Sequence, residues 1–159
     1  MTTIMTTNAE LLALLKQGTE VWNQWREKHP EVKPNLIRAE LRKANLNQIN
    51  LSEADLISAD FDQATLTAAD LHKADLHKAI LKAADLYKAD LSGAILSAAN
   101  LSDADLSRTD LSDANLIGAN LSGAKLHETN LTGAKLDDTN LEQADLAGAI
   151  LPGAHIRNQ

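Results

Sequence analysis

The chain of 159 residues contains no cysteine and very few aromatic residues: two Trp, one Tyr and one Phe. Without cysteine it has neither a disulfide framework nor a thiolate nucleophile, and zinc sites that need sulfur ligands are excluded. A single domain of this size ordinarily uses more aromatic side chains in its core. The interior must therefore be built mainly from leucine and alanine.

Long apolar segments are also missing. The run LLALL at 11–15 is far shorter than the roughly 20 residues of a membrane span. The opening MTTIMTTNAE lacks the basic region of a secretory signal. We therefore expect a cytoplasmic protein that does not associate with membranes.

An excess of positive charge is absent as well. The net charge is −7, and residues 91–159 hold most of the excess, with nine acidic residues against four basic ones. Proteins that bind nucleic acids usually carry a basic surface. The sequence therefore predicts no direct binding to nucleic acid.

What the sequence does contain is a five-residue repeat. Centres placed at 36, 41, 46 and so on to 156 make 25 pentads, and 23 centres are Leu; the exceptions are Phe61 and Ile156. Ala occupies 20 of the 25 positions two residues before the centre, and Asp or Asn occupies 17 of the 25 positions in between. Such a regular period indicates a repeat architecture.

The period of five excludes a continuous helix or strand. On an α-helix five residues advance about 500°, so the leucines would scatter around the surface. On a continuous strand an odd step sends alternate leucines to opposite faces. All the leucines can face the same interior only if the chain turns inside every pentad. Ala and Leu then point inward, Asp or Asn points outward, and the other two residues form a corner.

A chain that bends the same way every five residues winds into a solenoid around an apolar axis. Neighbouring coils of that solenoid lie about 4.8 Å apart, as strands do in a sheet. The core positions expected on this basis include Leu46, Leu56, Phe61, Leu66, Leu86, Ala104, Leu106 and Leu126.

The stretches ANLNQINLSEADLISADF and ADLSRTDLSDANLIGANLSGAKL resemble the A(D/N)LXX motif of the pentapeptide repeat proteins, a bacterial family abundant in cyanobacteria. The resemblance covers residues 34–158. It implies an all-β solenoid, a right-handed quadrilateral β-helix with four pentads per coil and therefore about six coils. Departures from the usual Asp or Asn include Ile80, Ile95, Lys125, Lys135, Ile150 and His155.

Residues 1–33 lie outside the repeat and are expected to form a helical capping segment for a repeat domain at 34–159. Thr7 and Glu10 match the T-x-x-E capping box of a helix start, and a second helical stretch, TEVWNQWREKH, precedes Pro30. A solenoid needs a cover over its end coil. The side chains expected to provide it are Leu11, Leu15, Trp22 and Trp25; a cofactor or membrane role for the tryptophans is the alternative.

No comparable helix follows the last repeat. Ile150, Leu151 and Ile156 are expected near an end that no helix covers. Some members of the family dimerise end to end through such a terminus. The resemblance therefore implies an end-to-end homodimer.

The position of each side chain in the five-residue repeat determines which candidate metal-binding or catalytic groups can lie close together. His72 and His77 are five residues apart and fall on adjacent sides, so they do not converge on a metal ion. With four pentads per coil, Asp70, Asp90 and Asp110 stack into a carboxylate ladder that could attract calcium. A convex wall offers no pocket, so we expect these side chains to bond the nearby backbone. We predict no catalytic residue, metal site or cofactor, and no enzymatic activity.

Four lysines lie close together in the sequence: Lys73, Lys78, Lys82 and Lys88. They would form a basic patch on an otherwise acidic rod, where an acidic partner could bind. A solvated surface without a partner is the alternative. Together with Asp70, Asp90 and Asp110, these lysines are the candidate partner surface.

Two functions follow from the resemblance and the charge. The first is a non-catalytic scaffold or regulator that presents a rigid rod to an unidentified protein partner. The alternative is a DNA mimic, because some members of the family inhibit or protect DNA gyrase by imitating the duplex. Six coils make a rod roughly 30 Å long, over which duplex DNA carries about 17 charges. The net charge of −7 is low for a mimic.

Overall fold

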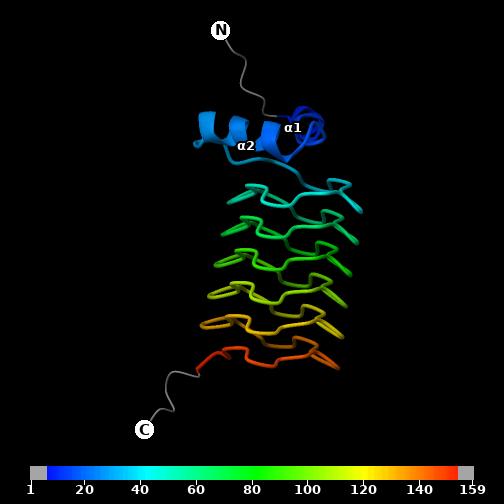
Figure 1. Ribbon diagram of the computed structural model, residues 1–159, viewed down its shortest axis with the longest axis vertical. Coiled ribbons are helices and arrows are strands. Elements are labelled where there is room, and N and C mark those ends of the chain that lie inside the picture. The colour runs from blue at the N-terminus through cyan, green and yellow to red at the C-terminus, as the bar shows by residue number, and fades with distance from the viewer. Residues whose placement is uncertain (1–6, 154–159) are drawn as a thin grey trace.

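The computed structural model describes residues 7–153, which form two short helices followed by a stack of coils (Figure 1). Helix α1 spans Asn8–Leu15 and helix α2 spans Thr19–Lys28. The two helices lie over one end of the stack, beside its first coil. Within the described range, neither helix has the length and apolar character needed to cross a membrane.

The coils repeat every 20 residues. Parallel β-bridges run from Asn35 with Asp55 to Asn130 with Ile150, and every bridge recorded between residues 35 and 150 joins positions 20 apart. Each coil therefore contains four pentads, one on each of four sides. The bridges stay isolated and the described residues contain no longer strand, because the chain turns after each bridge.

Backbone hydrogen bonds hold the coils together. The Leu86 N–H donates to the Asp105 carbonyl of the next coil at 2.8 Å, and the Asp85 N–H donates to the Ala64 carbonyl of the previous coil at 3.0 Å. The Ala89 N–H closes the corner by donating to the Leu86 carbonyl at 2.9 Å. These three bonds recur in pentad after pentad, together with a fourth from the N–H two residues after the centre, as from Lys88 to the Ser107 carbonyl at 3.1 Å. Four of the five backbone N–H groups of a typical pentad are thus satisfied without long strands.

Each corner contains a left-handed residue. The residue two after the centre has a positive φ, as in Lys88 at 58° and Asp103 at 58°. A positive φ confined to the third residue of a four-residue turn is the mark of a type II turn. The sequence predicts a corner here but does not reveal its handedness, because most of these positions are not glycine. Gly123 is one that is, and a Cβ added there would collide with the Asp103 carboxylate.

The centre of each coil is apolar. The inward residues expected from the repeat, from Leu46 to Leu126 and including Phe61 and Ala104, are buried. Three threonines stand where alanine is usual, and the Oγ1 atoms of Thr109, Thr129 and Thr139 each donate to a carbonyl of the preceding coil at 2.7 Å. The interior therefore contains hydroxyls only where they have a partner.

Candidate interaction surfaces

The outward Asp and Asn side chains bind the backbone of their own corner. Every Asp or Asn at this position accepts a hydrogen bond at Oδ1 from the N–H two residues later. Asp105, for example, accepts from the Ser107 N–H at 3.0 Å. The local hydrogen bonding predicted from the sequence is confirmed.

These bonds explain why the repeat favours Asp and Asn. The N–H that they bind is the one in the pentad that takes part in neither the inter-coil bonds nor the turn bond. Two departures follow the same logic. The Thr67 N–H donates instead to Asn47 Oδ1 of the coil below at 2.9 Å, and Ile150 is followed at the corresponding place by Pro152, which has no N–H to satisfy. An acceptor stabilises the corner without having to be charged, and the corners that follow Ile80, Ile95, Lys125 and Lys135 form without an Asp or Asn.

One side of the rod carries three negative charges in a column. Bridges join Asp70 to Asp90 and Asp90 to Asp110, with Asn50 and Asn130 at the two ends of the column. We call Asp70, Asp90 and Asp110 the acidic ladder. The Asp70 side chain remains 43% exposed, so its charge is accessible from solvent while its Oδ1 atom binds the backbone.

The four lysines do not form the single patch expected from the sequence. Lys73, Lys78 and Lys88 each occupy the left-handed corner residue of their pentad. Lys82 lies one position before that residue in the pentad between them. Because four pentads complete one coil, one step of five residues moves the chain to the next side. The lysines therefore encircle the rod, and a flat partner would meet only one or two of them.

A second side has charges of both signs. The Arg108 Nε atom donates to Glu128 Oε2 at 2.8 Å, and this hydrogen bond and the Glu128 charge raise the pKa of Arg108. A hydrogen bond from His127, aided by one from the Ala147 N–H, lowers the pKa of Asp145. These groups are exposed, so the pairs contribute little to stability. The negative charge of the rod is thus concentrated on particular sides.

His72 and His77 lie on neighbouring sides of the rod, as their spacing predicts, and their side chains have different partners. His72 Nδ1 lies 2.9 Å from Asp70 Oδ1, at the edge of the acidic ladder. His77 Nδ1 lies 2.8 Å from Ser97 Oγ of the next coil. The spacing of the histidines predicts their separation, but it does not show that His72, two residues after Asp70, lies beside the acidic ladder.

The helices supply donors to the open edge of the first coil. In α1, Asn8 Nδ2 donates to the Asn35 carbonyl at 3.2 Å and to the Ile37 carbonyl at 3.1 Å. In α2, Trp22 Nε1 donates to the Asn50 carbonyl at 2.7 Å. In later coils the corresponding carbonyls accept N–H groups of the preceding coil. Side chains of the helices therefore replace donors that a preceding coil would provide.

The same helices bury apolar and cationic groups against the coil. Leu11, Leu15, Trp22 and Trp25 are buried, and the two indole rings lie 5.3 Å apart. Arg26 is also buried, and this burial lowers the pKa of its guanidinium. Its Nη2 atom donates to the Ser52 carbonyl at 3.0 Å, so a charged side chain completes the same edge.

The last described coil is open. Ile150 and Leu151 remain 42% and 44% exposed. Beside them an apolar groove of about 670 Å³ is lined mainly by Ala134, Leu136, Leu141, Leu146 and Leu151. Ile156, the third residue expected at this end, lies outside the described residues.

Comparisons with known proteins agree with this geometry. The family model described as pentapeptide repeats matches eight copies, in overlapping segments that together run from residue 35 to residue 158. The resemblance inferred from the motif is therefore confirmed. No curated protein matches the chain closely enough to count as a relative.

Several solved structures are similar to this chain. The pentapeptide repeat protein Rfr23 from the cyanobacterium Cyanothece 51142 is 27% identical, with 81% of this chain and 99% of that chain covered and a TM-score of 0.60. The pentapeptide repeat protein alr5209 from Nostoc PCC 7120 is 32% identical, with coverage of 79% and 80% and a TM-score of 0.37. Full-length QnrB1, a plasmid-mediated fluoroquinolone resistance protein, is 18% identical, with coverage of 77% and 69% and a TM-score of 0.35.

Proposed function

Because the chain belongs to the pentapeptide repeat family, whose members fold as right-handed quadrilateral β-helices, we propose that it is a non-catalytic scaffold that binds a protein partner through its outer wall. Proteins of this family are generally structural. The outward side chains of this chain are held at regular spacing by bonds to their own corners. A rigid array of this kind loses little side-chain entropy when a partner binds.

The acidic ladder is the proposed contact surface. Asn makes the same corner bond as Asp, as Asn50 and Asn130 do on this side of the rod. The fold therefore does not require Asp70, Asp90 and Asp110 to be charged. Three negative charges in register favour a partner with a basic surface, since complementary charge speeds encounter and rejects wrong partners. This is the observation on which the proposal rests.

The experiment neutralises the ladder without disturbing the corners. A variant with Asp70→Asn, Asp90→Asn and Asp110→Asn keeps all three acceptors of the backbone N–H groups. The wild type, this variant and a control with Asp105→Asn on another side are each used to capture proteins from lysate, followed by quantitative mass spectrometry. We expect one basic partner to be lost only with the ladder variant. Equal capture by all three proteins would rule out the ladder as the contact surface.

We propose that residues 1–33 cap the repeat domain at 34–159. The donors from Asn8, Trp22 and Arg26 to first-coil carbonyls support this division, because an uncovered coil edge invites pairing with other chains. A segment that covers this edge also leaves the sides of the rod as the surface for a partner. We place the protein in the cytoplasm, which microscopy of a fluorescent fusion would test.

At the opposite end we propose an end-to-end homodimer. Exposed Ile150 and Leu151 and the neighbouring apolar groove support it, because contiguous apolar surface marks an interaction site. Light scattering at micromolar concentration is expected to give twice the mass of the chain, and Leu151→Glu is expected to give the monomer. A wild-type protein that stays monomeric would remove this proposal and leave the ladder proposal intact.

A DNA mimic that binds gyrase is the alternative function. The acidic ladder favours it, although the net charge of −7 is low for a mimic of this length. The mixed charges around Arg108 and the ring of lysines disfavour it, because duplex DNA is negative on every side. Inhibition of DNA supercoiling by the purified protein would make this alternative the better one. A role as a cyanobacterial regulator would be a special case of the scaffold.

A further inference from the structure

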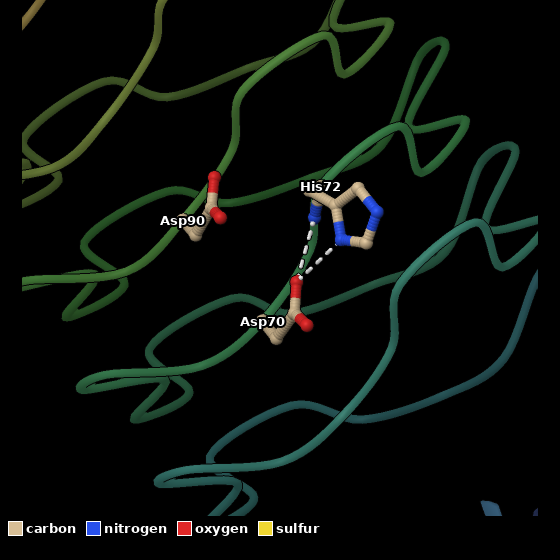
Figure 2. A group of neighbouring side chains, drawn as sticks. All are labelled: Asp70, His72 and Asp90. Carbon is tan, nitrogen blue, oxygen red and sulfur yellow. Dashed lines mark hydrogen bonds and ion pairs between the residues drawn. The ribbon is translucent and has the colours of Figure 1, made fainter.

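One histidine stands beside two rungs of the acidic ladder. Figure 2 shows Asp70, His72 and Asp90 projecting from the same side of successive coils. One ligand atom from each lies within 4.8 Å of the other two, and within residues 7–153 no other three His, Cys, Asp or Glu side chains gather in this way. We propose that these three side chains bind a divalent transition-metal cation of the zinc type.

The separations suit a shared ion. Zinc is bound by imidazole nitrogen and carboxylate oxygen at about 2.1 Å in a tetrahedral arrangement, so two ligands of one ion lie about 3.4 Å apart. His72 Nδ1 and Asp70 Oδ1 are 2.9 Å apart, so they need to separate by only about half an ångström to share an ion. Asp90 needs a side-chain adjustment of about one to two ångströms to join them. One of its oxygens, Oδ1, is held by the Ser92 N–H, which leaves the other free to bind the ion.

A third carboxylate, that of Glu53, faces the far edge of the imidazole. His72 Nε2 lies 3.9 Å from Glu53 Oε1 in the preceding coil. When Nδ1 supplies the lone pair to a metal, the ring proton is on Nε2, where Glu53 can accept it after a small movement. Histidines that bind metals commonly have such a carboxylate behind them, because it fixes the ring and raises its basicity. Glu53 is thus a positioning residue.

Neighbouring cations limit the attraction of the site. Arg26 interacts with both Glu53 and Asp70 through its charge, and Lys73 follows His72 directly in the chain. Three carboxylates against two cations leave one negative charge. The mixed nitrogen and oxygen ligands, more than the local potential, therefore determine the affinity. This favours zinc over calcium, which prefers oxygen ligands alone.

The chain contains its own control. The next pentad repeats the sequence ADLHK, so Asp75 and His77 have the same relation as Asp70 and His72. On the following coil, however, Asp75 is bridged to Ile95, whereas Asp70 is bridged to Asp90; the aspartate bridged to Asp75, Asp55, lies on the preceding coil. His77 therefore lacks the carboxylate that Asp90 offers to His72, and its Nδ1 atom contacts Ser97 Oγ of the following coil instead.

The experiment is calorimetric titration of the untagged full-length chain with Zn²⁺ and, separately, with Ca²⁺. The variants are His72→Ser, its control His77→Ser, and Asp90→Asn, which keeps the corner bond. Serine already occupies the equivalent position at 92 and 112, so the histidine variants should fold, and circular dichroism checks this.

We expect one Zn²⁺ per chain, an affinity at least about tenfold weaker in His72→Ser and in Asp90→Asn, and no change in His77→Ser. Equal loss in the two histidine variants would overturn the proposal. So would binding of Ca²⁺ as tight as that of Zn²⁺, or no saturable binding of Zn²⁺ at all.

Discussion

Replacing Asp105 by alanine and, separately, by asparagine tests why the repeat selects these residues. Asp105 Oδ1 accepts the Ser107 N–H at 3.0 Å, and alanine removes this acceptor. A hydrogen bond of this kind contributes about 0.5–1.5 kcal/mol. Asparagine keeps the acceptor and removes the negative charge. Asp105 is bridged to the like charge of Asp85 on one coil and to the opposite charge of Lys125 on the other, so the two effects oppose each other and the asparagine variant should be about as stable as the wild type.

The difference between the two variants isolates the hydrogen bond, since both lack the charge. We expect the alanine variant to be less stable than the asparagine variant by about 1 kcal/mol, which corresponds to a fall in melting temperature of about 2–4 °C for a chain of this size. Guanidinium unfolding followed by circular dichroism measures it. If alanine and asparagine give equal stability, the reasoning on the corner bond is refuted.

Three further predictions concern the core, the cap and one ion pair. Leu106→Ala in the closed interior should cost about 2.7–5 kcal/mol of unfolding free energy; a loss below 1 kcal/mol in denaturant unfolding would contradict the buried position. Trp22→Phe keeps a buried ring but leaves the Asn50 carbonyl without its indole donor, so stability should fall by about 1–3 kcal/mol, whereas unchanged melting would show that the bond is dispensable. Hydrogen bonding from His127 lowers the pKa of Asp145, so its contribution to stability is present above the ordinary Asp pKa of about 3.9 and is lost as the pH falls through the lowered value. The variant His127→Ser should raise the pKa of Asp145 measured by NMR, and an unchanged pKa would contradict the pairing.

The repeat frame could be derived from the sequence because its period is incompatible with any unbroken element. The inward leucines and the outward aspartates follow from the same geometric argument. The left-handed corner residue does not, because residues such as Lys88 and Asp103 occupy it more often than glycine does. The inter-coil bonds fix the backbone there, so residue type carries little signal.

The candidate site was only partly predictable, since contacts between coils depend on how many pentads make one coil. The stacking of Asp70 on Asp90 follows once that number is four, but the place of His72 beside them depends on side-chain direction. The lysines show the opposite error. Closeness in the sequence suggested a patch, although a step of five residues turns the chain to a different side.

The central claim is that residues 20 apart lie side by side on neighbouring coils. A chain without cysteine allows a direct measurement with the pair Ser92→Cys and Ser112→Cys, compared with Ser92→Cys and Ser107→Cys. Adjacent coils place the first pair about 4.8 Å apart, within the range that a disulfide spans. Mild oxidation followed by mass spectrometry should show an intramolecular disulfide in the 92/112 protein and none in the 92/107 protein. The reverse result, or equal crosslinking of both, would contradict the account.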